Sequence, residues 1–116
     1  MLVVDDSALV RRQVGNTLRT AGYEIVEAVD GIDAREKLSA AHDVAMIVCD
    51  VTMPRMNGLE FLNVLREDKF AGSVVMLTTE GRPEIVTQAR ALGAKGWLVK
   101  PLKADLLLAT VAKLVG

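Results

Sequence analysis

Short apolar segments alternate along the chain with segments whose apolar residues recur every three or four positions. The apolar segments have the composition of buried strands, which we predict at 2–4, 23–28, 44–50, 73–78 and 97–100. The periodic segments predict helices at 7–21, 32–41, 59–66, 83–92 and 103–114. Turn signals separate several of these elements: Asp30-Gly31, and Asn57-Gly58 at the end of a loop over 54–58. Gly22 follows the first predicted helix, where a C-terminal glycine is common.

The composition of the strands indicates how these elements pack. Strands that are apolar throughout, and not only at every second residue, are typical of a parallel sheet covered on both faces. The helices that connect such strands supply the two covering layers. The sequence therefore predicts an α/β fold, a doubly wound (βα)5 sandwich, with residues 1–116 as a single domain and no output domain.

Composition and charge argue against several other classes of protein. The chain has 116 residues with 14 basic and 15 acidic side chains, so it has no basic excess of the kind that binds nucleic acid. No apolar run approaches the ~20 residues that a membrane span requires. The single cysteine, Cys49, is expected to be a small buried residue, and one cysteine fits a reducing compartment. We expect a cytoplasmic monomer that binds neither nucleic acid nor membrane.

Polar side chains gather where four of the five predicted strands end. They are Asp5 and Asp6 after the first strand, Asp50 at the third, Thr78 and Thr79 at the fourth, and Lys100 at the fifth. Because the carboxyl ends of parallel strands share one edge of the sheet, where ligands of such folds bind, we expect these side chains to converge. Each has an ordinary interpretation of its own: a helix cap for Asp6-Ser7, a plain strand end for Thr78-Thr79, and a solvated lysine. Their convergence favours a functional site.

Three clustered carboxylates that stay ionised call for a cation. Ligands that are all oxygen suit Mg²⁺, which usually takes one or two carboxylates and a phosphate oxygen. A remaining carboxylate can then act as a nucleophile towards phosphorus. Phosphoryl transfer depends mainly on positioning and charge neutralisation, for which a lysine and a hydroxyl are suitable groups. The pattern therefore predicts Mg²⁺-dependent phosphoryl chemistry.

Four motifs resemble those of one protein family in their order and spacing. They are VVDDS, IVCDVTMPRMNG, MLTTEG and KGWLVKP, and together they span nearly the whole chain. The chain resembles the receiver domains of two-component response regulators, of the single-domain CheY-like kind. That resemblance implies a five-stranded parallel sheet in the flavodoxin-like order 2-1-3-4-5.

The resemblance also implies roles for the acidic residues. Asp50 matches the phosphoacceptor, and Asp5 and Asp6 match the acidic pair that holds Mg²⁺, Asp6 directly and Asp5 through water. Thr52 would offer its backbone carbonyl to the metal. Thr52 stands where chemotaxis members often have asparagine.

Other positions match residues that respond to the phosphoryl group. Lys100 matches the lysine that pairs with the phosphoacceptor, and Thr78 the hydroxyl that moves towards the phosphoryl group. Trp97 occupies the family's switch position, which is usually Tyr or Phe. Thr79 and Glu80 are expected to tune the site. In the family, the positions of Thr52 and Glu80 flank the path of the water that removes the phosphoryl group. The resemblance favours a cis Lys100–Pro101 bond, whereas base rates favour trans.

The leading interpretation is a phosphorylation-controlled signalling switch, not an enzyme in the usual sense. The implied donors are a sensor histidine kinase or a small phosphodonor such as acetyl phosphate, and the implied readout is a separate protein, first of all a flagellar motor component in chemotaxis. An intermediate carrier in a phosphorelay is the second choice, with a phosphotransfer protein as its partner. A pseudo-receiver that binds partners without phosphorylation also remains open.

Other sites that suit this fold agree less well with the residues. An aspartyl-nucleophile phosphatase of the haloacid dehalogenase type needs an acid two residues after the nucleophile, and that position is Thr52. Flavin binding needs a glycine- and hydroxyl-rich phosphate loop after the first strand, where the chain has DDSALVRR. A dinucleotide site needs G-x-G-x-x-G, which is absent. His42 has no partner at ligand spacing, which argues against a zinc site.

Overall fold

The sheet has five parallel strands in the order β2-β1-β3-β4-β5. The structure is a computed structural model that describes residues 1–40, 44–51, 56–78 and 83–115. The strands are β1 (Leu2–Val4), β2 (Val26–Ala28), β3 (Met46–Asp50), β4 (Ser73–Thr78) and β5 (Gly96–Val99). This confirms the predicted fold class and strand order. Four of the five predicted strands keep their place within two residues at each end.

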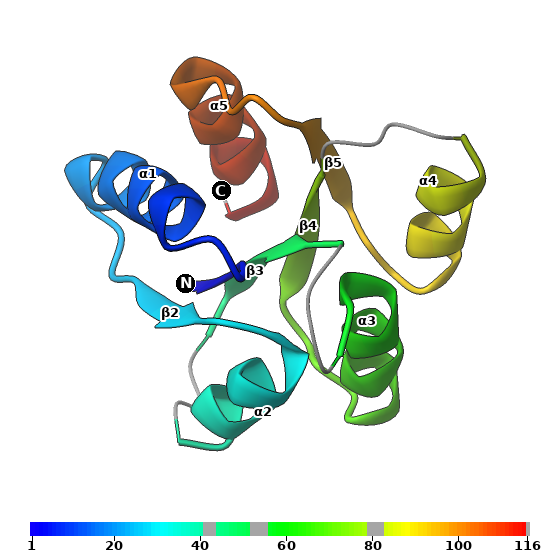
Figure 1. The fold of residues 1–116 in the computed structure, drawn as a ribbon. Helices are drawn as coiled ribbons and strands as arrows, with labels where there is room; N and C mark the ends of the chain where they lie inside the picture. Colours follow the sequence, from blue (N-terminus) through cyan, green and yellow to red (C-terminus); the bar gives the residue numbers. More distant parts are fainter. Residues whose placement is uncertain (41–43, 52–55, 79–82, 116) are drawn as a thin grey trace.

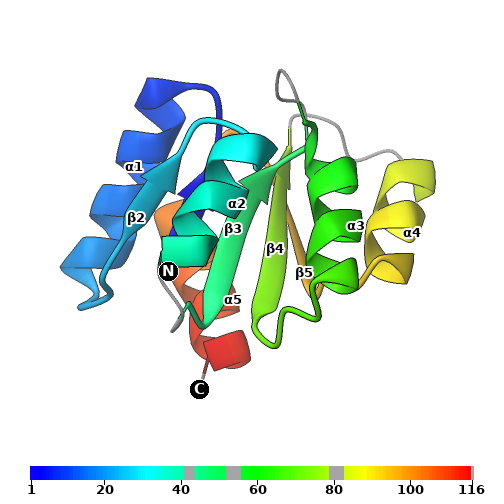
Figure 2. The ribbon, with the colours of Figure 1, turned by 90° about the horizontal axis from the view of Figure 1, so that it is seen from below.

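Helices cover both faces of the sheet, as the uniformly apolar strands predict. They are α1 (Ala8–Thr20), α2 (Gly31–Ala40), α3 (Gly58–Glu67), α4 (Pro83–Ala91) and α5 (Ala104–Val115). Figure 1 shows α1 and α5 on one face and α2, α3 and α4 on the other. Figure 2 shows α2 and α3 lying in front of the sheet. Each face has its own core, one centred on Leu18, Met46 and Leu107 and the other on Ile47, Phe61 and Met76.

The second strand is shorter than the sequence predicts. Strand β2 begins at Val26, whereas the apolar segment begins at Tyr23. The backbone of Tyr23 closes the preceding helix instead, because its N–H donates to the Leu18 carbonyl over 3.1 Å. Gly22 has a φ of 97°, which permits the left-handed conformation that ends a helix, as predicted.

The two turn signals are helix starts. The side chain of Asn57 accepts from the Glu60 N–H, and the Glu60 side chain accepts from the Asn57 N–H, so this pair forms a capping box for α3. Asp30 behaves similarly before α2, since its Oδ1 accepts from the Asp33 N–H over 2.9 Å. Short polar side chains before glycine suit both turns and helix caps, and here the following apolar residues extend the turn into a helix.

The register of the sheet brings its polar strand ends together. Val4 lies beside Cys49, Asp50 beside Leu77, and Thr78 beside Val99. The residues that follow or end β1, β3, β4 and β5 therefore share one edge. That edge carries the predicted site.

Candidate functional site

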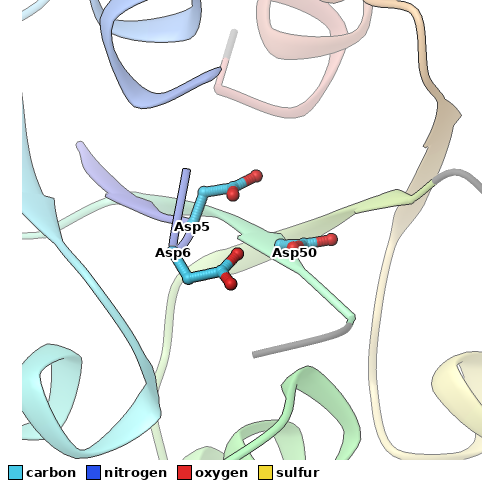
Figure 3. Close-up of side chains that lie close together, drawn as sticks. All are labelled: Asp5, Asp6 and Asp50. Atoms are coloured by element: carbon cyan, nitrogen blue, oxygen red, sulfur yellow. The ribbon is translucent and has the colours of Figure 1, made fainter. Parts of the chain in front are cut away.

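Three carboxylates meet at the carboxyl edge of the sheet. One oxygen each from Asp5, Asp6 and Asp50 lies within 4.8 Å of the others. Asp5 and Asp6 follow β1, and Asp50 ends β3, so the sequence-distant acids are brought together as predicted (Figure 3). Asp5 and Asp50 are buried, with 1% and 6% of their surface exposed, whereas Asp6 is exposed.

Both carboxylate oxygens of Asp5 have hydrogen-bond partners within the protein. Its Oδ1 accepts from the Ser7 N–H over 2.9 Å, and its Oδ2 accepts from the Lys100 ammonium over 3.1 Å. The Asp5 N–H donates to the Ala28 carbonyl, which fixes its backbone against β2. These bonds make Asp5 a poor direct ligand. The exposed Asp6 is better placed to contact an ion.

Lys100 neutralises part of this negative charge. Its ammonium lies 3.1 Å from Asp5 and 3.5 Å from Asp50, and its side chain is only 18% exposed. Burial acts to lower the pKa of Lys100, but the bonds to Asp5 and the proximity of Asp50 outweigh it and raise that pKa above 10.5. The lysine is therefore a fixed cation at the site.

The backbone around Lys100 also places it at this edge. Its N–H donates to the Thr78 carbonyl over 2.7 Å, which joins the ends of β4 and β5. The Lys100–Pro101 bond is cis, as the family resemblance implies and against the base rate. Thr78 is 2% exposed, so its hydroxyl is enclosed at the edge that carries Asp50.

Cys49 is buried in the core beside the acids, as expected for a small packing residue. Its Sγ donates to the Asp50 carbonyl over 3.2 Å. Burial raises the pKa of the Cys49 thiol well above 9.0, and the negative charges of Asp50 and Asp5 raise it further. The thiol is therefore a neutral packing group next to the acid cluster.

Trp97 lies on the face of the sheet that α2, α3 and α4 cover. It is half-buried and packs against the core that contains Met76 and Ala89. Its indole Nε1 is buried and, in the described part of the chain, has no hydrogen-bond partner. A buried indole N–H usually finds a hydrogen-bond partner, so this unpaired N–H sets Trp97 apart from an ordinary core residue.

Some sequence predictions fall outside the described residues. These are the roles of Thr52, Thr79 and Glu80, and the argument against a zinc site at His42. Among the predicted site residues, the structure gives the positions of the three acids, Lys100, Thr78 and Trp97.

Two residues that the sequence interpretation missed contact the acid cluster. Gly58, the first residue of α3, lies against the backbone of Asp50 and donates its N–H to the Val51 carbonyl over 2.7 Å. Arg11 donates from its Nη1 to the Asp5 carbonyl over 2.6 Å. A signal for Arg11 exists in the sequence, since it precedes the core residues Val14 and Leu18 at helical spacing and so borders the buried face of α1.

The donor set fits a hard divalent cation. All three groups offer oxygen, one of them is exposed, and the two buried carboxylates share a single lysine. Oxygen ligands with open positions for water and phosphate are what Mg²⁺ prefers. A soft metal would need sulfur or imidazole ligands, and the nearby thiol is held neutral.

The whole arrangement matches a known family. Residues 1–112 match the response regulator receiver domain family. The chain belongs to the response regulator receiver family. This receiver is 39% identical to the chemotaxis protein CheY of Treponema pallidum, over 99% of the chain and 81% of that protein.

Solved structures agree with this family assignment. The structure of the Vibrio cholerae chemotaxis protein CheY4 has a TM-score of 0.91 and 43% identity, covering 97% of this receiver and 95% of that chain. A CheX-CheY-BeF3-Mg²⁺ complex from Borrelia burgdorferi has a TM-score of 0.90 and 30% identity, covering 97% and 85%. The receiver is thus CheY-like and consistent with a chemotaxis response regulator. Among the described residues, no helix is long and apolar enough to cross a membrane.

Proposed function

We propose that this receiver is a phosphorylation-controlled signalling switch that takes a phosphoryl group on Asp50 with the help of Mg²⁺. The observation that carries the proposal is the group of three carboxylates within 4.8 Å, with Lys100 bridging Asp5 and Asp50. The buried Asp50 has the position of a nucleophile, and the exposed Asp6 that of a metal ligand.

The proposed reaction is a phosphoryl transfer to a carboxylate. An Asp50 oxygen attacks the phosphorus of the donor, the new oxygen–phosphorus bond forms, and the bond from phosphorus to the leaving group breaks with its electron pair remaining on that group. A Mg²⁺ ion held by the acid cluster would supply positive charge against the phosphoryl oxygens. Asp6 and Asp50 would hold the ion directly, with Asp5 acting through water because both of its oxygens are engaged.

Lys100 and Thr78 respond to the added charge. The ammonium, 3.5 Å from Asp50, keeps its proton because its pKa is raised, so it remains available to a phosphoryl oxygen. The enclosed Thr78 hydroxyl lies at the same edge and supplies a donor. These two contacts favour the phosphorylated arrangement, and a ligand shifts a conformational equilibrium only through such a difference in affinity.

The change reaches the surface through Trp97. Thr78 and Trp97 lie on neighbouring strands, with Met76 paired to Trp97 two residues before Thr78. Movement of Thr78 towards the phosphoryl group leaves space that the indole ring occupies. The exposed end of β5 and the adjoining helices then present a different face to a partner. Thr52, Thr79 and Glu80 are proposed to tune the metal site and the lifetime of the phosphoryl group.

The relatives of this receiver indicate where such a switch acts. The relatives named above are chemotaxis proteins, and one is solved with CheX. We therefore propose a histidine kinase as the donor, acetyl phosphate as a small-molecule substitute, and a flagellar motor component or its regulator as the partner.

The test is uptake of phosphate from acetyl phosphate, followed by intact-protein mass spectrometry. Wild-type protein with Mg²⁺ should gain the mass of one phosphoryl group, and Asp50→Asn should gain none. Asp68→Asn is a matched control, because Asp68 is an exposed acid at the far end of α3. Uptake by Asp50→Asn at the wild-type level would refute the nucleophile assignment.

A further inference from the structure

Arg11 has a bonding pattern that the phosphoryl chemistry leaves unexplained. It is the fourth residue of α1, and its side chain is only 16% exposed although it carries a charge. Its guanidinium has two polar contacts with residues that the structure describes. Nη1 donates to the Asp5 carbonyl over 2.6 Å, and Nε lies 3.4 Å from the Glu27 carboxylate.

The carbonyl that Arg11 holds belongs to the peptide between Asp5 and Asp6. Its orientation therefore sets where the Asp6 side chain begins. The backbone N–H of Asp5 is also hydrogen-bonded to β2, because it donates to the Ala28 carbonyl over 3.1 Å. Glu27 precedes Ala28 on the same strand and lies beside Val3. Strand β2 thus fixes the Asp5 backbone at two points, directly through Ala28 and indirectly through Glu27 and Arg11.

We propose that Arg11, braced by Glu27, is a positioning residue that presents the Asp6 carboxylate to Mg²⁺. The inference rests on the proposed function, since it assumes that Mg²⁺ binds at the acid cluster. Asp6 needs such help because it is exposed, whereas Asp5 and Asp50 are held by burial and by Lys100. Outer-shell groups that orient metal ligands commonly contribute about 10–100-fold to metal affinity.

If Arg11 acted only through its charge, its removal would change the Mg²⁺ affinity in the opposite direction to a loss of positioning. A guanidinium near the cluster repels a divalent cation, so its removal would tighten Mg²⁺ binding if charge were its whole contribution. Loss of positioning instead weakens binding. A role in fold stability alone would lower resistance to urea and leave the Mg²⁺ dissociation constant of the folded protein unchanged.

The neighbouring residue provides a matched control. Arg12 is exposed, adjacent on α1, and carries the same charge. Calorimetric titration with Mg²⁺ compares wild type, Arg11→Ala, Arg11→Lys and Arg12→Ala, at a temperature where urea curves show every variant folded. Arg11→Ala should bind Mg²⁺ about tenfold more weakly, Arg11→Lys to an intermediate degree, and Arg12→Ala as tightly as wild type or slightly more so. The lysine variant also keeps the test decisive if the alanine variant does not fold.

Glu27→Ala tests the brace. It should weaken Mg²⁺ binding by less than the roughly tenfold expected for Arg11→Ala, because Glu27 is one contact further from the metal. It should have no further effect in the Arg11→Ala background. Additive losses, or an unchanged affinity in Glu27→Ala, would overturn the role of Glu27. Arg11→Ala binding as tightly as wild type would overturn the inference and leave the proposed function standing. A wild-type protein that binds no Mg²⁺ would overturn both.

Discussion

Gly58 begins α3 directly against the strand end that carries Asp50, and substitution there tests how closely the helix must approach. A Cβ at this position would overlap the Asp50 carbonyl oxygen and lie 2.8 Å from both the Val51 Cα and the Met76 methyl. Two of these three neighbours are backbone atoms, which cannot move aside by changing a rotamer. The Gly58→Ala substitution therefore forces α3 away from β3 or shifts Asp50 itself.

The expected change in the free energy of unfolding is the difference between two opposing effects. Alanine is favoured over glycine in a helix by up to about 1 kcal/mol, whereas overpacking costs about 1–3 kcal/mol and occasionally more. Because the contacts are with backbone, we expect a net loss of about 2 kcal/mol in the free energy of unfolding. For a domain of this size, that corresponds to a fall in Tm of about 8 °C. Phosphate uptake on Asp50 should also slow, since positioning dominates phosphoryl transfer.

The assay is urea denaturation followed by circular dichroism, with Gly15→Ala as the matched control. Gly15 lies inside α1, and its added Cβ would meet the flexible Arg19 guanidinium at 3.3 Å and the Ile25 side chain at 3.7 Å. We expect Gly15→Ala to be neutral or to stabilise by up to about 1 kcal/mol. Ordinary surface substitutions change the free energy of unfolding by no more than about 0.5 kcal/mol. If Gly58→Ala changes it by no more than this, the close approach of α3 to Asp50 is wrong.

Three further predictions concern the charged and buried groups of the site. Because the pKa of Lys100 is raised in the folded state, its contribution to stability is fully present below pH 10.5 and is lost as the pH rises through the folded-state pKa. The difference in unfolding free energy between wild type and Lys100→Met should therefore shrink above pH 10.5 in urea titrations, and a constant difference would contradict the ion pairs. Cys49 should resist iodoacetamide at neutral pH until urea unfolds the chain, because burial raises the pKa of its thiol; rapid alkylation of the native protein would show that the thiol is accessible. In calorimetric titration, Asp6→Asn should weaken Mg²⁺ binding more than Asp5→Asn, because both oxygens of Asp5 already accept hydrogen bonds; the reverse order would exchange the two assignments.

The sequence predicted the fold well because its strands are uniformly apolar and its helices are periodic. The same parallel topology requires Asp50, Thr78 and Lys100 to lie at one edge, so their convergence could be predicted from the sequence alone. The cis bond before Pro101 followed from family resemblance, since base rates alone favour trans.

Other features depended on tertiary contacts that pattern alone does not fix. Asn57-Gly58 and Asp30-Gly31 have the composition of turns, and only the packing of the following residues makes them helix starts. Tyr23 is of a residue type that favours strands, but its N–H donates to the Leu18 carbonyl at the end of α1. The pairing of Arg11 with Glu27 requires the placement of α1 beside β2, which residue periodicity cannot supply.

The proposed function depends above all on which residue carries the phosphoryl group. After treatment with acetyl phosphate and Mg²⁺, the protein would be digested and its peptides sequenced by mass spectrometry. We expect a single phosphoryl group on Asp50 and none when Mg²⁺ is removed by chelation. A phosphoryl group on another residue, or uptake on Asp50 that is unaffected by chelation, would contradict the proposed function.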